Sequence, residues 1–220
     1  MTNLEEVVLH LVMFDIDGTL VNSSSFEDVC YSKAVLGVIK HPVDTDWSKY
    51  TNVTDSGILD EIIDKNGLDS DRYNIHSAVK LSFTSHIKSH LHHTSVKEIE
   101  GASEFIQLLR QRDDVVLAIA TGGWQETARL KLESAGIDYS GIAFASGSYH
   151  IKRIDIMKIA KAKCSESRFT SKSYFGDAIW DKKASQELGF NFILVGDKVN
   201  HTQKIMNFNF SEKPLTLIGL

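Results

Sequence analysis

The chain has 220 residues, of which 42% are hydrophobic and 24% are charged, and its formal net charge is -5. These values are typical of a globular protein and exclude a strongly basic surface for nucleic acid or anionic membranes. No apolar run approaches the roughly 20 residues that a membrane-spanning helix needs. The first six residues carry two acids, which does not favour a secretory signal. Two distant cysteines, Cys30 and Cys164, favour reduced thiols. We therefore expect a cytoplasmic protein without nucleic-acid or membrane partners.

The first recognisable element is an apolar segment, residues 11–14, which predicts a strand buried on both faces. Asp15 and Asp17 follow it directly. Acids at the carboxyl end of a buried strand are poorly placed for packing but well placed for chemistry, because ligands of open α/β sheets bind there. A calcium-binding loop also begins Asp-x-Asp, but the positions that require glycine and an acid hold Leu20 and Phe26. For the isolated motif, a turn cap stays the alternative.

Residues 22–95 lack a convincing strand and predict three helices instead. Ser24 or Ser25 is expected to cap the first helix, and Asp55 or Ser56 the second. In the third, apolar residues recur at intervals of four and form one stripe. We therefore expect this segment to form a small helical domain inserted after the first strand.

From Glu100 onward, predicted strands alternate with predicted helices of about ten residues. The strands are expected at residues 115–120, 142–145, 173–175 and 190–195. This alternation predicts right-handed crossovers and a parallel sheet with helices on both faces. The expected fold is therefore α/β and Rossmann-like. Residues 1–21 and 96–220 are expected to form its core and residues 22–95 an inserted helical cap.

Polar groups gather at the ends of the predicted strands. Thr121 and Gly122 follow the second strand, and Asp177 follows a later one with Asp181 one helical turn further on. Because parallel strands end at one edge of a sheet, we expect these groups to converge with Asp15. Converging carboxylates repel one another unless a cation lies between them, and oxygen-only ligation favours Mg²⁺. A helix N-cap is the alternative role for Asp177.

Three segments resemble motifs of the haloacid dehalogenase superfamily. Residues 14–20 (Phe-Asp-Ile-Asp-Gly-Thr-Leu), 120–123 (Ala-Thr-Gly-Gly) and 176–181 (Gly-Asp-Ala-Ile-Trp-Asp) resemble its first, second and fourth motifs. Their order and intervals agree over nearly the whole chain. The inserted helices resemble the cap of phosphoglycolate phosphatase-like members. The third motif departs from the family pattern, because Lys152 and Arg153 lack the proline that often follows the cation. Which of the two binds phosphate stays open.

The resemblance implies a Mg²⁺-dependent phosphatase acting on a small phosphorylated metabolite. Asp15 is then the nucleophile that forms an aspartyl-phosphate, and Asp17 is the general acid and base. The resemblance places Mg²⁺ on Asp15, the backbone carbonyl of Asp17 and Asp177, with Asp181 as a ligand or a support for the ligands. The phosphate is expected to be held by Thr121, Gly122 and one of the two cations, Lys152 or Arg153.

Three other activities are compatible with the same fold. A phosphosugar mutase returns the phosphoryl group to its substrate instead of giving it to water. A 2-haloacid dehalogenase needs no acid for its leaving group and typically lacks the second aspartate, so Asp17 argues against that activity. A non-catalytic binding protein is disfavoured because every expected acid is present.

Overall fold

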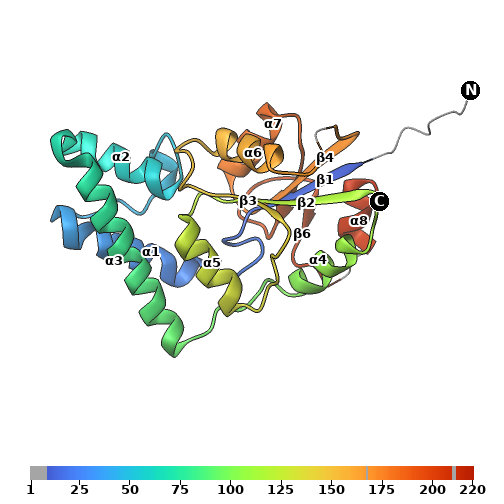
Figure 1. Cartoon of the computed structure of the whole chain (residues 1–220), viewed down its shortest axis with the longest axis horizontal. Coiled ribbons are helices and arrows are strands. Elements are labelled where there is room, and N and C mark those ends of the chain that lie inside the picture. Colours follow the sequence, from blue (N-terminus) through green and yellow to red (C-terminus); the bar gives the residue numbers. More distant parts are fainter. Residues whose placement is uncertain (1–8, 167, 210–211) are drawn as a thin grey trace, which may run out of the picture.

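The computed structural model describes residues 9–166, 168–209 and 212–220. Its sheet has the strand order β3-β2-β1-β4-β5-β6, and all neighbouring strands are parallel (Figure 1). The strands are β1 (His10–Phe14), β2 (Val115–Ala120), β3 (Ala143–Ala145), β4 (Ser171–Gly176), β5 (Asn191–Val195) and β6 (Lys204–Ile205). The predicted parallel α/β sheet is confirmed. The sequence did not predict β6, because two residues are too few to show a periodic pattern.

Helices cover both faces of this sheet. They are α4 (Ala102–Arg110), α5 (Gln125–Ser134), α6 (Arg153–Ala162), α7 (Ile179–Glu187) and α8 (Glu212–Ile218). The side chains of β1 alternate between two hydrophobic clusters. Val12 and Phe14 pack with α4, α5 and α8, whereas Leu11 and Met13 pack with α6 and α7. As the sequence predicted, β1 is buried on both faces, so the residues that follow it emerge from the centre of the molecule.

Between β1 and α4 the chain forms a separate group of helices, on the left in Figure 1. They are α1 (Ser24–Ile39), α2 (Asp55–Lys65) and α3 (Arg72–His93), with short 3-10 helices at Trp47–Lys49 and Asp69–Asp71. Their apolar side chains form a third hydrophobic cluster, which also takes in Trp124 from the loop after β2. We call residues 22–95 the helical segment. Its own hydrophobic cluster agrees with a distinct unit, and the division into two domains stays a prediction.

Two predicted helix caps are wrong by one or two residues. α1 has Ser23 at its N-cap position, and the hydroxyl of Ser23 makes no cap bond because it binds Asp17. α2 is capped by Thr54, whose hydroxyl accepts a hydrogen bond from the backbone N–H of Gly57 at 3.0 Å. Both sites offer several adjacent polar residues, so the pattern could not decide which one precedes the first turn.

The chain enters and leaves the helical segment through two connections that lie side by side. The backbone N–H of Asn22 donates to the carbonyl of Lys97 at 2.9 Å, and that of Ile99 donates to Leu20 at 2.8 Å. Paired connections of this kind allow two units to rotate against each other about one axis. We therefore expect the helical segment to move about this pair of connections.

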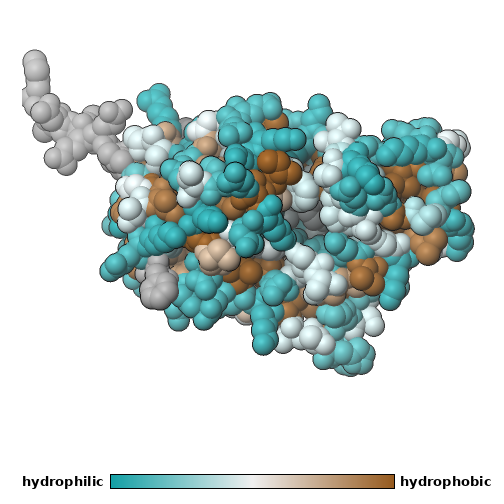
Figure 2. All heavy atoms as spheres, turned by 180° about the vertical axis from the view of Figure 1, so that it is seen from behind, coloured by the Kyte–Doolittle hydropathy of each residue, from teal (hydrophilic) through white to brown (hydrophobic). Residues whose placement is uncertain are grey.

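The described surface carries few exposed hydrophobic side chains. Figure 2 shows hydrophilic residues over most of one face, with hydrophobic atoms in small, separated patches. The most exposed large apolar residues are Tyr73 and Leu81 on α3. In the described parts of the chain, no helix combines the length and the hydropathy that crossing a membrane requires.

Candidate active site

Three carboxylates converge at the carboxyl ends of the central strands. Asp15 follows β1, Asp177 follows β4, and Asp181 lies in the first turn of α7. One oxygen from each lies within 4.8 Å of the others, and all three residues are buried. We call these residues the three-acid cluster; among residues 9–166, 168–209 and 212–220 it is the one group of this kind. The donors are all oxygen atoms, so this cluster could hold a hard divalent cation.

Asp177 takes part in this cluster and does not cap a helix. The N-cap of α7 is Ala178, and Asp181 accepts a hydrogen bond from its backbone N–H at 3.1 Å. Asp177 instead binds Lys198, whose Nζ lies 2.6 Å from Oδ2. Gly18 lies beside it with a φ of +75°, and a Cβ at that position would lie 2.0 Å from Asp177 Oδ2. The turn after β1 therefore needs glycine both for its backbone conformation and for this close approach.

Burial and mutual repulsion make these carboxylates hard to ionise together. Burial, followed by the charge of Asp181, raises the pKa of Asp15 well above its ordinary value, whereas Arg153 acts in the opposite direction. Burial also raises the pKa of Asp181 to about 6, although Arg153 opposes it. For Asp177, burial raises the pKa and Lys198 opposes the rise. Further positive charge close to the three carboxylates would therefore favour their ionised forms.

Of the two cations that the sequence left open, the structure brings only Arg153 to the cluster. Its Nη1 lies 3.2 Å from Asp15 Oδ1, 2.9 Å from Asp181 Oδ1 and 3.3 Å from the hydroxyl of Tyr174. Its side chain is 10% exposed. Lys152 is the N-cap residue of α6, and it is exposed and does not line the cavity described below. The described geometry thus favours Arg153 as the cation that meets a bound anion.

The loop after β2 forms the next wall of the site. Thr121 and Gly122, which the sequence predicted to hold a phosphate, both line the cavity. Their binding of phosphate stays a prediction. The hydroxyl of Thr121 accepts a hydrogen bond from the backbone N–H of Gly123 at 3.2 Å. A Cβ at Gly122 would lie 2.6 Å from Nη2 of Arg153. Glycine at this position therefore lets the guanidinium approach the loop.

Asp17 is held by residues that the sequence reasoning missed. Its Oδ1 accepts a hydrogen bond from the hydroxyl of Ser23 and lies 2.5 Å from Nζ of Lys131 in α5. Lys131 also pairs with Glu27 of α1. Burial alone would raise the pKa of Asp17, but Lys131, Glu27 and Ser23 together hold it below its ordinary value. Lys131 lies between Leu130 and Leu132, so the available signal was a lysine flanked by two leucines in a predicted helix.

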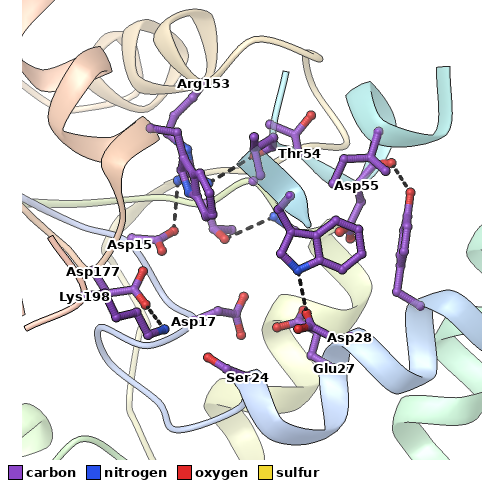
Figure 3. Close-up of a pocket in the computed structure, with 18 residues that line it drawn as sticks. Asp15, Asp17, Ser24, Glu27, Asp28, Thr54, Asp55, Arg153, Asp177 and Lys198 are labelled. Carbon is purple, nitrogen blue, oxygen red and sulfur yellow. Dashed lines mark hydrogen bonds and ion pairs between the residues drawn. The ribbon is translucent and has the colours of Figure 1, made fainter. Parts of the chain in front are cut away.

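A cavity of about 180 Å³ opens beside the three-acid cluster and continues to the helical segment. In Figure 3, Asp15 and Asp177 lie on one side of it, and Asp28 and Asp55 lie on the other. Every charged lining residue that comes from the helical segment is an acid: Glu27, Asp28 and Asp55. The cations among the lining residues, Arg153 and Lys198, belong to the strand-end side. The sequence reasoning did not identify Lys198, which reaches the site from the loop after β5.

The start of α2 is bonded to the loop after β2. Asp55 Oδ2 accepts a hydrogen bond from the backbone N–H of Trp124 at 2.7 Å, and Ser56 Oγ accepts one from its indole N–H at 2.6 Å. Ser56 in turn donates to the carbonyl of Gly147 at 2.8 Å. Burial raises the pKa of Asp55 to about 7. Trp124 is buried in the hydrophobic cluster of the helical segment, whereas Trp47 lines the cavity and donates to Asp28 at 3.1 Å.

A family model described as haloacid dehalogenase-like hydrolase matches residues 12–195. The match spans most of the chain, including the strand ends that carry Asp15, Thr121 and Asp177. The chain therefore belongs to the haloacid dehalogenase-like hydrolases and is an enzyme of that class. A comparison with curated proteins finds no match.

Solved structures share this fold at low sequence identity. CbbY from Rhodobacter sphaeroides, in complex with phosphate, is 14% identical with a TM-score of 0.65, and the match covers 92% of this chain and 96% of that one. A provisional phosphoglycolate phosphatase from Lactobacillus plantarum is 18% identical (TM-score 0.62; 96% and 99% covered). A provisional β-phosphoglucomutase from Bacteroides vulgatus is 14% identical (TM-score 0.67; 97% and 90% covered). At such identities these similarities show a common fold.

Proposed function

We propose that the protein is a Mg²⁺-dependent phosphatase that hydrolyses a small phosphomonoester. The observation that carries the proposal is the position of Asp15 in the three-acid cluster, with the guanidinium of Arg153 at 3.2 Å. A carboxylate that attacks a phosphate dianion needs positive charge nearby that offsets the repulsion between the two anions. The fold neighbour CbbY, which was solved with phosphate, supports a phosphorylated ligand.

The three-acid cluster fits Mg²⁺ by the chemistry of its donors. Asp15 and Asp177 would hold the ion together with the backbone carbonyl of Asp17, and Asp181 would act as a ligand or fix the others. All these donors are oxygen atoms, and burial raises the pKa values of the three side chains, so a bound divalent cation would favour their ionised forms. When bound, Mg²⁺ supplies charge that offsets the repulsion between carboxylate and phosphate.

In the first half of the reaction, a carboxylate oxygen of Asp15 forms a bond to phosphorus. The bond from phosphorus to the leaving oxygen breaks, its electron pair stays on that oxygen, and Asp17 supplies the proton. Arg153 and the hydroxyl of Thr121 hold the phosphoryl oxygens during the transfer, with the backbone of Gly122 beside them.

In the second half, water attacks the phosphorus of the aspartyl-phosphate. Asp17, which lost its proton in the first half, accepts one from this water. The bond between phosphorus and Asp15 breaks, inorganic phosphate leaves, and both side chains return to their starting states. The same carboxyl group thus serves first as acid and then as base.

The helical segment faces the leaving group in this scheme and acts as the cap. Its contribution to the cavity wall is acidic and aromatic, with Asp28 and Asp55 beside the rings of Tyr31 and Trp47. Such a wall repels a second anionic group and accepts hydroxyl or ammonium donors. We therefore expect a substrate whose leaving alcohol is neutral or cationic, such as a polyol or amino alcohol, in preference to one that carries a carboxylate or a second phosphate.

Release of phosphate from an aryl phosphate tests the proposal. We expect turnover with Mg²⁺, none after EDTA treatment, and none by Asp15→Asn, a variant that keeps the side-chain shape and removes the nucleophile. A phosphosugar mutase is the second candidate, which the β-phosphoglucomutase-like fold neighbour supports. Incubation with a hexose phosphate separates the two: free phosphate supports hydrolysis and an isomeric product supports the mutase. Undiminished activity of Asp15→Asn would rule out both.

A further inference from the structure

Lys131 is a charged residue that the proposed reaction leaves without a task. Its side chain is 0% exposed. An ammonium group withdrawn from water loses much hydration free energy and persists in an interior only where carboxylates pair with it. The partners here are Asp17, at 2.5 Å from Nζ, and Glu27. Burying a lysine in this way costs stability. The position of Lys131 beside Asp17 therefore points to a role for Lys131 in the reaction.

The contacts of Lys131 fix the orientation of Asp17. Lys131 and the hydroxyl of Ser23 both bind the same oxygen, Oδ1. The described residues give Oδ2 no hydrogen bond. A Cβ on Gly123, which lines the cavity, would lie 3.6 Å from Oδ2. One oxygen of Asp17 is therefore anchored, and the other is available on the side of the cavity.

The contacts of Lys131 with Asp17 and Glu27 join three separate parts of the chain. Asp17 lies in the turn after β1, Lys131 in α5 and Glu27 in α1 of the helical segment. Lys131 thus has one carboxylate partner in the α/β part and one in the helical segment. The orientation of Asp17 consequently depends on how the helical segment is docked.

On the basis of the phosphatase activity proposed above, we infer that Lys131 is a positioning residue for the general acid. It holds Oδ1 of Asp17 so that Oδ2 meets the leaving oxygen. As the bond from phosphorus to that oxygen breaks, the proton moves from Oδ2 to the oxygen and leaves Asp17 negative. The contribution of Lys131 is the orientation of this carboxyl group, which it fixes through Oδ1, and not the strength of the ion pair. Lys131 itself touches neither substrate nor metal.

Dependence of the rate on the leaving group distinguishes this role from a merely structural one. A good leaving group such as nitrophenolate departs without a proton, whereas an alkoxide needs one. The experiment measures kcat/KM, which covers the steps through transfer to Asp15, for nitrophenyl phosphate, phenyl phosphate and an alkyl phosphate. For Lys131→Met we expect a small loss with nitrophenyl phosphate and a loss of roughly 100-fold with the alkyl phosphate.

Two further variants secure the test. Lys172→Met is the matched control: Lys172 is partly buried at the start of β4, donates to the carbonyl of Leu188 at 2.8 Å, and lies at the opposite end of the strand from the site. We expect it to keep wild-type values with all three substrates. Glu27→Gln keeps the side-chain shape and removes one partner of Lys131, so it should show the same dependence to a smaller degree. If Lys131→Met does not fold, the result with Glu27→Gln decides.

The outcomes separate the inference from the proposed function. Losses that grow as the leaving group worsens support the positioning role. Equal losses with all three substrates, or no loss, would overturn it while the phosphatase proposal stands. Absence of Mg²⁺-dependent turnover by the wild-type protein would overturn the proposed function, and this inference with it.

Discussion

The two sides of the cavity differ in how their charges are balanced. On the strand-end side, each acid of the three-acid cluster lies against a cation, either Arg153 or Lys198. On the side of the helical segment, Asp28 and Asp55 accept hydrogen bonds from Trp47 and Trp124 instead. The first side is suited to an anion that must be held and attacked. The second is suited to a group that donates hydrogen bonds or carries positive charge. Under the proposed function, one cavity would combine a general site for phosphate with a selective site for its alcohol.

The largest effect on this difference between the two sides is expected when the cation on the strand-end side is removed. For Arg153→Met we expect kcat/KM to fall by roughly 10² to 10³, because one donor to the transferring group is lost. Lys152→Met is the control at the neighbouring position, and we expect its kcat/KM to stay within about twofold of wild type because Lys152 is exposed. A larger loss for Lys152→Met than for Arg153→Met would show that Lys152, and not Arg153, contacts the phosphate.

The next largest effect concerns the affinity for Mg²⁺. We expect Asp181→Asn to weaken Mg²⁺ binding by roughly 10- to 100-fold, because Asp181 is either a ligand or supports one. Isothermal titration calorimetry with MgCl₂ measures the change without any substrate. Asp28→Asn, on the opposite side of the cavity, serves as the comparison and should bind Mg²⁺ as the wild-type protein does. Unchanged binding by Asp181→Asn would place the ion elsewhere.

Changes on the other side of the cavity should alter selectivity more than rate. We expect Asp28→Asn to lower kcat/KM for an amino-alcohol phosphate about tenfold relative to phosphoglycolate, since about one charged contact is lost. Hydrolysis of a nitrophenyl phosphate should change little, because its ring makes no use of that charge. A panel of metabolite phosphates assayed for phosphate release provides the measurement. A wild-type preference for phosphoglycolate or a bisphosphate would contradict our interpretation of the acidic wall.

The smallest effect is a pH dependence of stability. Burial raises the pKa of Asp55 from 3.8 to about 7, so between about pH 4 and pH 7 the folded state binds its proton more tightly than the unfolded state. The contribution of Asp55 to the free energy of unfolding therefore falls as pH rises through this window and is lost above it. In Asp55→Asn, which can still accept the hydrogen bond from Trp124, Tm should decrease less between pH 5 and pH 8. The exposed Asp113→Asn is the control and should follow the wild-type protein; identical pH profiles for Asp55→Asn would contradict the burial argument.

The strand-end side of the cavity is the side that could be predicted from the sequence. Asp15, Thr121 and Asp177 follow buried strands of one parallel sheet, so topology alone brings them to one edge. Periodicity likewise predicted β1, β2 and the helical segment. The missing elements, β6 and the caps Ser23 and Thr54, depended on short segments or on a choice between neighbouring polar residues.

Tertiary packing determines the remainder of the site. Lys131 lies on a helix, Glu27 on another, and Lys198 in a loop, and no strand end brings them together. Their contacts with Asp17 and Asp177 depend on how helices and loops pack, which neither spacing nor periodicity encodes. Selectivity is difficult to read from the sequence for the same reason, because the helical segment contributes side chains from separate helices.

The close packing around Gly18 limits the point mutations that this position can accept. A single base change in a glycine codon, unless silent, yields a stop codon or one of Ala, Val, Ser, Cys, Arg, Trp, Asp and Glu, and every one of these residues carries a Cβ. At this position that atom would lie 2.0 Å from Asp177 Oδ2, and the φ of +75° would be strained as well. No missense change one base away preserves both the turn and the position of the Asp177 carboxylate. Gly18 should therefore tolerate no substitution in a mutational scan, although it contributes no functional group to the reaction.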